Sequence, residues 1–92
     1  MLKRFVIERD IPGVGTLTKP ELGAAADTSN KALSKLAPKV QWQHSYVAAN
    51  KTFCIYLADS REAIEKHAEI SGFPANIITE ITGIIDPTTR AA

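Results

Sequence analysis

Residues 40–58 read VQWQHSYVAANKTFCIYLA and predict a β-hairpin. Val40–Ala48 and Lys51–Ala58 are rich in the β-branched and aromatic residues that strands favour. Between them, Ala49-Asn50 supplies a two-residue turn, which sets the register of the two strands. In that register Tyr46 pairs with Phe53, His44 with Ile55 and Trp42 with Leu57.

The register also predicts which side chains enter the core. We expect Phe53, Ile55 and Leu57 to face the helices, because the larger side chains of both strands then meet in the core. Their partners on the first strand point the same way. One extra residue in the turn would instead place His44 and Tyr46 on the helix-free face, since a one-residue slip exchanges the two faces.

Helices are predicted on both sides of the hairpin. Upstream, Thr18-Lys19-Pro20-Glu21 is a capping box, and the helix that follows runs to about Leu36 before Pro38. Downstream, Gly72 is a natural cap for a helix of about Arg61–Ser71. The inward stripe of the first helix consists of Leu22, Ala25, Ala26, Ser29, Leu33 and Leu36.

The outer strands complete the fold. Lys3–Arg9 alternates like a strand, and Ile77–Ile85 predicts a last strand that bends or divides at Gly83. The order strand, helix, strand, strand, helix, strand predicts an α+β, ferredoxin-like (split βαβ) sandwich, with an antiparallel sheet of order 4-1-3-2 and both helices on one face. We expect one domain over residues 1–87 and a flexible tail over residues 88–92.

Composition narrows the classes of function. The 92 residues include 11 basic and 10 acidic side chains, for a net charge of +1, so no electrostatic footprint for nucleic acid or for a membrane surface is visible. No apolar run approaches the ~20 residues of a membrane span. A single cysteine cannot form a disulfide within the chain. We therefore expect a cytoplasmic protein.

Five motifs follow one another along almost the whole chain. They are Phe5-Val6-Ile7-Glu8-Arg9-Asp10-Ile11-Pro12-Gly13, Trp42…Ser45-Tyr46-Val47, Cys54…Tyr56, His67-Ala68…Gly72-Phe73-Pro74-Ala75 and Ile85-Asp86-Pro87. In these motifs the chain resembles a largely uncharacterised family of small bacterial ferredoxin-like proteins, whose described member is a dimeric nickel-binding protein that sequesters the metal. The resemblance implies the same fold, a short fifth strand if Gly83 divides the last one, a homodimer, and nickel as a ligand.

A ligand pocket is one interpretation of the aromatic and histidine residues. The apolar side of the second helix carries His67, so this side chain is expected to face inward. In the predicted register Trp42, His44 and Tyr46 project into the same space between sheet and helices, and Arg9 could hold an anion at its mouth. The alternative is that these residues only fill the core.

A metal site is the second interpretation. Imidazole suits nickel, copper and zinc, which makes His44 and His67 the candidate ligands for nickel or another divalent metal. They lie 23 positions apart, and the predicted topology separates them by roughly 10 Å or more. One ion held by both histidines of one chain is not expected. A surface or inter-subunit site, in which a neighbouring chain adds a carboxylate to His44, remains open.

The helix-free face of the sheet is the predicted dimer interface, with Cys54 beside Val6 at its centre. We expect that face to carry Val6, Gln41, Gln43, Ser45, Cys54 and Tyr56. Cys54 then packs as a small hydrophobe, because no base lies within its reach on that face.

Two functions follow. The first is a small dimeric metal-binding protein without catalysis. The second is a dimeric αβ-barrel small-molecule binding protein or enzyme, with His67 as its acid or base. A cavity of several hundred Å³ beneath the second helix would favour the second function.

Overall fold

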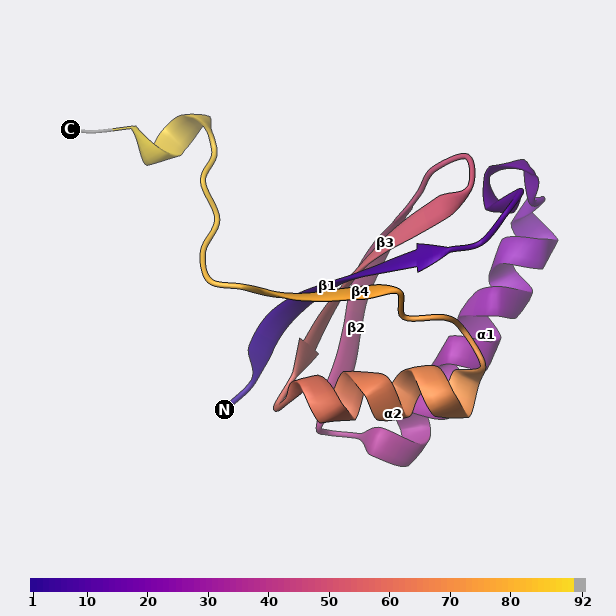
Figure 1. The fold of residues 1–92 in the computed structure, drawn as a ribbon, viewed down its shortest axis with the longest axis horizontal. Coiled ribbons are helices and arrows are strands. Elements are labelled where there is room, and N and C mark those ends of the chain that lie inside the picture. Colours follow the sequence, from indigo (N-terminus) through magenta and orange to yellow (C-terminus); the bar gives the residue numbers. More distant parts are fainter. Residues whose placement is uncertain (91–92) are drawn as a thin grey trace.

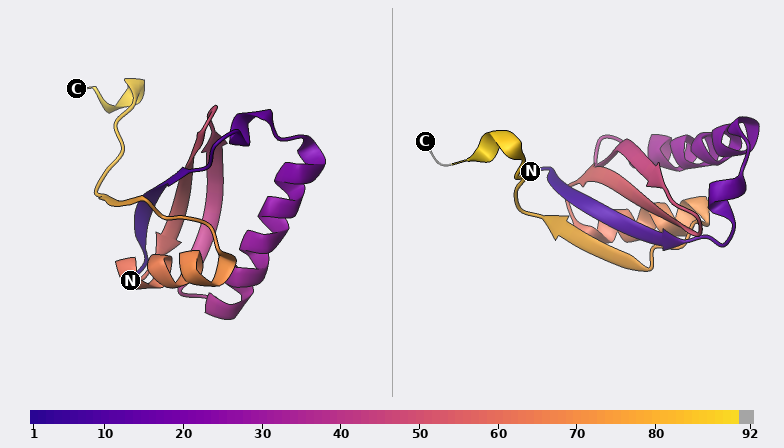
Figure 2. Two further views of the ribbon diagram at one scale, coloured as in Figure 1. Left: turned by 45° about the vertical axis from the view of Figure 1, so that its right-hand side comes forward. Right: turned by 90° about the horizontal axis from the view of Figure 1, so that it is seen from above.

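The computed structural model describes residues 1–90. Its elements are β1 (Lys3–Asp10), η1 (Val14–Thr16), α1 (Lys19–Leu36), β2 (Val40–Val47), β3 (Lys51–Ala58), α2 (Arg61–Ser71), β4 (Ile77–Ile81) and η2 (Pro87–Thr89). The four strands form an antiparallel sheet of order β2-β3-β1-β4, and both helices cover the same face of it (Figures 1 and 2). The ferredoxin-like α+β fold is therefore confirmed.

Both helices begin and end at their predicted signals. The Thr18 hydroxyl accepts a hydrogen bond from the Glu21 backbone N–H at 3.3 Å, and the Glu21 carboxylate accepts one from the Thr18 N–H at 3.0 Å. The bonds that the Glu21 carboxylate accepts from the Thr18 N–H and from the Thr18 hydroxyl lower its pKa below the ordinary value. Gly72 ends α2 in the left-handed conformation, with φ of 79°, which an L side chain rarely adopts.

The last strand is shorter than predicted. β4 stops at Ile81, and the chain then leaves the body of the domain as an extended segment (Figure 1). Ile84 and Ile85 on this segment are exposed. A fifth strand is not found within residues 1–90. The tail predicted for residues 88–92 falls partly outside the described residues, and its described part overlaps η2.

The hairpin register is confirmed near the turn and wrong further along. Tyr46 pairs with Phe53 and His44 with Ile55, as predicted, but Trp42 pairs with Tyr56 because a β-bulge lies between Trp42 and His44. A bulge adds one residue to its strand, so side chains on its two sides no longer alternate in step. The Trp42 Nε1–H accordingly donates to Ser45 Oγ at 3.0 Å.

The predicted faces of β3 are wrong. Paired residues share a face, and Phe5 and Ile7 of β1 pair with Tyr56 and Cys54. Cys54 and Tyr56 are therefore buried under the helices, whereas Phe53, Ile55 and Leu57 lie on the helix-free face and are only half-buried. Every position of this strand except Lys51 and Thr52 is apolar or aromatic, so alternation could not distinguish its two faces.

The core lies between the sheet and α2. Its buried members are Phe5, Ile7, Val40, Cys54, Tyr56, Ala58, Ile64 and Ile78. Leu33 and Leu36, near the end of α1, pack against this cluster. Within residues 1–90, neither α1 nor α2 combines the length and the hydropathy needed to cross a membrane.

Candidate functional site

A cavity of about 320 Å³ lies between the sheet and the first half of α1. The sheet contributes Arg9, Trp42 and Tyr56 to its wall, and the segment after α2 contributes Phe73 and Pro74. Most of the remaining wall is aliphatic. The cavity is therefore beside α1 rather than beneath α2, where the core is filled.

The small side chains of α1 explain why this space is open. Ala25, Ala26 and Ser29 line the cavity, whereas Leu33 and Leu36, one to three turns later on the helix, reach the core. A methyl or hydroxymethyl group extends much less far from the helix than a leucine side chain. The inward stripe that the sequence predicts thus packs the core at one end of α1 and leaves it hollow at the other.

Arg9 is a buried cation in this wall. It is only 2% exposed, and its Nη1–H donates to the Pro74 carbonyl at 2.7 Å. Its Nη2 is buried and has no hydrogen-bond partner among the described residues. No carboxylate within residues 1–90 pairs with it. The guanidinium carbon lies 5.9 Å from the centroid of the Tyr56 ring, a cation–π contact that offsets only part of the desolvation.

A buried chain of polar groups connects this wall to α2. The Ser29 hydroxyl is hydrogen-bonded to the Tyr56 hydroxyl at 3.2 Å and to His67 Nε2 at 3.1 Å. The Tyr56 and His67 rings meet edge to face, with centroids 5.1 Å apart. Burial raises the pKa of Tyr56. Burial, and secondly the charge of Arg9, lower the pKa of His67 to about 4, so its imidazole is neutral at pH 7.

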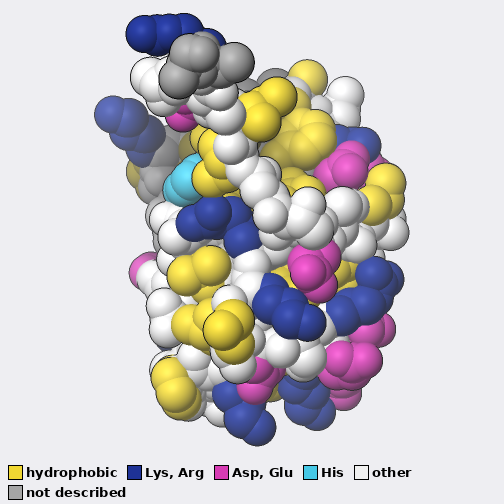
Figure 3. All heavy atoms as spheres, turned by 90° about the vertical axis from the view of Figure 1, so that its left-hand side faces the viewer, with side chains coloured by type: hydrophobic (Ala, Val, Ile, Leu, Met, Phe, Trp, Pro, Cys, Tyr) yellow, Lys and Arg dark blue, Asp and Glu magenta, His cyan; other side chains and the backbone are white. Residues whose placement is uncertain are grey.

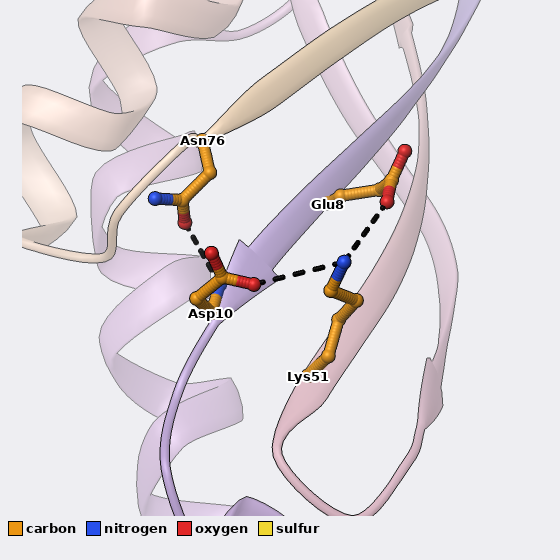
Figure 4. A network of polar contacts seen from close by, with 4 residues as sticks. All are labelled: Glu8, Asp10, Lys51 and Asn76. Atoms are coloured by element: carbon orange, nitrogen blue, oxygen red, sulfur yellow. Dashed lines mark hydrogen bonds and ion pairs between the residues drawn. The ribbon is translucent and has the colours of Figure 1, made fainter.

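Hydrogen bonds and ion pairs hold the strand ends next to the cavity (Figure 4). Lys51 Nζ lies 3.2 Å from Glu8 Oε1 and 3.7 Å from Asp10 Oδ1, and the Asp10 N–H donates to Asn76 Oδ1 at 2.8 Å. The bond to Glu8 raises the pKa of Lys51. These contacts tie β1, β3 and the segment before β4 together where the chain turns from β1 toward the cavity.

Gly13 and the short helix η1 that follows it pack on the β2–β3 turn. The Gly15 N–H donates to the Ala49 carbonyl at 2.9 Å. A Cβ at Gly15 would lie 2.7 Å from the Ala48 carbonyl oxygen, so only glycine allows this approach. Val14 is thereby held in the cavity wall.

The predicted pocket residues divide between two faces. Arg9 and Trp42 line the cavity, and His67 lies behind it, one hydrogen bond away through Ser29. The expectation that His44 and Tyr46 also point between sheet and helices is wrong, because both lie on the helix-free face. Sequence reasoning missed the roles of Ser29 and Tyr56. A serine within an otherwise apolar stripe was the available signal for Ser29.

His44 and Tyr46 form an exposed pair on β2. His44 Nε2 is hydrogen-bonded to the Tyr46 hydroxyl at 3.1 Å, with the rings edge to face at 5.1 Å. They border a depression of about 390 Å³ whose other walls include Arg4, Ile55 and Ile81. On the side of the molecule near the two chain ends, a surface histidine lies beside hydrophobic and basic side chains (Figure 3).

The two histidines cannot share one ion within a chain, since the sheet lies between them. In the part of the chain that the structure describes, no three His, Cys, Asp or Glu side chains come together. The imidazole of His44 is a nitrogen donor of the kind that suits nickel, copper and zinc.

Comparison with known proteins identifies the family. The family described as "Nickel responsive protein SCO4226-like" matches residues 5–81. The crystal structure of SCO4226 from Streptomyces coelicolor A3(2) superimposes with a TM-score of 0.74 at 19% sequence identity, over 89% of this chain and 99% of that chain. That likeness shows a shared fold. No curated protein matches the chain. The match over residues 5–81 means that the chain belongs to the SCO4226-like family of nickel-responsive proteins.

Proposed function

We propose that this protein binds nickel as a homodimer and does not catalyse a reaction. The observation that carries the proposal is the exposed imidazole of His44, on the apolar helix-free face of a chain that belongs to a nickel-responsive family. An imidazole at such a place can bind a metal jointly with donors from a second copy. The one cysteine of the protein allows no disulfide within the chain, which suits a reducing compartment such as the cytoplasm.

The helix-free face supports association of two copies. Its central positions on β1 and β3 are Val6, Phe53, Ile55 and Leu57, all half-buried, and Ile77 and Ile81 of β4 extend the apolar surface. Monomeric proteins seldom leave contiguous apolar surface of this kind open to water. The predicted dimer interface is wrong for Cys54, Tyr56 and Ser45, because these three residues lie on the helix side of the sheet.

The polar chain of the core supports a role without catalysis. Ser29 and His67 have the spacing of a nucleophile and a base, but a general base works best with a pKa near the operating pH. The pKa of His67 is about 4, and its Nδ1 has no hydrogen-bond partner among residues 1–90 that would orient the ring. The thiol of Cys54 is buried and lies 3.4 Å from the Thr52 hydroxyl.

A calorimetric titration of chelator-treated protein tests the proposal, with nickel, zinc, copper and cobalt compared and the oligomeric state followed by light scattering. We expect nickel to bind in a fixed ratio to the dimer. We expect His44→Ala to weaken nickel binding. Nickel binding that is undetectable at millimolar metal, or that is unchanged in His44→Ala, would refute the proposed site.

A further inference from the structure

The cavity beside α1 is large enough to hold an organic molecule, and the proposed nickel site at His44 does not involve it. An apolar cavity of about 150 Å³ admits benzene. The cavity here measures about 320 Å³, within the range of small-molecule sites, so a ring with a short side chain fits it.

The wall specifies an apolar ligand body. Trp42 stacks on Tyr56, with ring centroids 6.4 Å apart and planes at 19°, and both line the cavity. Val14 from the first loop and Phe73 from the segment after α2 face the same space. Polar groups in the wall are few, as is usual for sites that bind drug-sized molecules by burial and orient them with one or two polar contacts.

The charge in the wall specifies an anionic end. Arg9 brings a full positive charge into the wall, and its Nη2 lacks a partner among the described residues. Because Nη1 already donates to the Pro74 carbonyl, the N–H groups of Nη2 are the donors left for a carboxylate oxygen. Among the described residues that line the cavity, Arg9 is the one charged side chain, so the wall suits a monoanion better than a phosphate ester.

We propose that this cavity binds a small monocarboxylate with an apolar, ring-sized body, whose carboxylate is held by Arg9. The site is independent of the proposed nickel site, because Arg9 and Trp42 face the helices whereas His44 faces the opposite side of the sheet. The two bound species therefore do not compete for side chains.

The experiment compares 4-phenylbutyrate with its neutral amide, 4-phenylbutyramide, by calorimetry on the metal-free protein. Trp42 is the only tryptophan and lines the cavity, so its fluorescence gives a second readout. We expect both compounds to change Trp42 fluorescence, with the carboxylate binding at least about tenfold more tightly than the amide. Equal affinity of the two compounds, or binding of neither at millimolar concentration, would overturn the proposal.

Two pairs of variants locate the site. Arg9→Met is expected to remove the preference for the carboxylate, whereas Arg61→Met keeps it, since Arg61 also donates to a backbone carbonyl, that of Ile78, but lies outside the cavity. Ala26→Phe fills the cavity and should abolish binding of both compounds. Ala24→Phe, on the exposed side of the same helix, should leave binding unchanged.

The second pair keeps the test decisive if Arg9→Met fails to fold. A folded Ala26→Phe variant that binds 4-phenylbutyrate as tightly as the wild type would show that the compound binds elsewhere and would overturn the proposal. Loss of binding in Ala26→Phe together with full binding in Ala24→Phe would support it.

Discussion

His44 and His67 lie on opposite faces of one four-stranded sheet. His44 is exposed on the helix-free face beside Tyr46, whereas His67 has no exposed surface and is hydrogen-bonded to Ser29 beneath the helices. The two imidazoles therefore have separate roles, and substitutions of each should affect different properties of the protein.

Replacing His44 should affect metal binding and not stability. We expect His44→Ala to weaken nickel binding at least about tenfold, or ~1.4 kcal/mol, with little change in Tm, because an exposed side chain contributes little packing. Calorimetry and thermal unfolding measure the two effects. Gln41→Ala, exposed on the same strand, is the control and should change neither. A nickel affinity that stays at the wild-type value would exclude His44 as a ligand.

Replacing His67 should affect stability and not metal binding. His67→Ala leaves a cavity and removes the bond to Ser29, so we expect the free energy of unfolding to fall by roughly 1–3 kcal/mol. Nickel binding should persist. Chemical denaturation and a nickel titration check the two statements. Unchanged stability together with lost binding of nickel would reverse the assigned roles.

Stability should depend on pH through His67. Its folded-state pKa, about 4, lies below its ordinary value of 6.5, so between these values the unfolded chain binds more protons than the folded one. Stability is therefore full above pH 6.5 and is lost as the pH falls. Between pH 6.5 and 4.5 we expect a loss of about 2 kcal/mol in the free energy of unfolding.

Urea denaturation at pH 6.5, 5.5 and 4.5 measures this dependence. His67→Gln is the matched control, because an amide can still bond to Ser29 and does not titrate. Its stability should change much less over the same range. Parallel curves for the wild type and His67→Gln would show that other groups cause the dependence.

Association should depend on the centre of the helix-free face. We expect the wild type to be a dimer at tens of micromolar by light scattering, and Ile55→Lys to be monomeric, because a buried unpaired ammonium opposes the interface. Glu69→Lys on the exposed side of α2 should remain dimeric. A monomeric wild type would reject the proposed assembly.

The cysteine should be dispensable for nickel binding. Cys54 is buried on the helix side of β3, whereas its neighbour in the chain, Ile55, faces the opposite side together with His44. We expect Cys54→Ser to bind nickel as the wild type does, with a serine hydroxyl near Thr52 in place of the thiol. A large loss of nickel affinity in the folded variant would identify the thiolate as a ligand.

The element order and the ends of the helices could be predicted because their causes are local. The capping box at Thr18 and Glu21 and the left-handed Gly72 depend on residues adjacent in the chain. The apolar period of α2 likewise sufficed to predict that His67 faces inward. With two helices and four strands in that order, right-handed crossovers leave few topologies, so the ferredoxin-like sheet followed as well.

The faces of the hairpin strands could not be predicted from the hairpin itself. Apolar residues occupy both faces of β3, so the pairing with β1 sets which side chains of β3 face the helices. In that pairing Phe5 and Ile7 lie opposite Tyr56 and Cys54. The bulge after Trp42 then separates this residue from His44, although the two are only two positions apart. No local propensity encodes either contact.

The amino-acid sequence alone was enough to predict the fold and the inward position of His67. That Arg9, Ser29 and Tyr56 meet around one cavity, and that His44 faces the opposite side of the sheet, depends on packing between distant elements. The difference lies in how far apart in the chain the interacting residues are. Helix caps and periodicity act between neighbours in the chain, whereas a cavity exists only where elements distant in sequence pack together with small side chains between them.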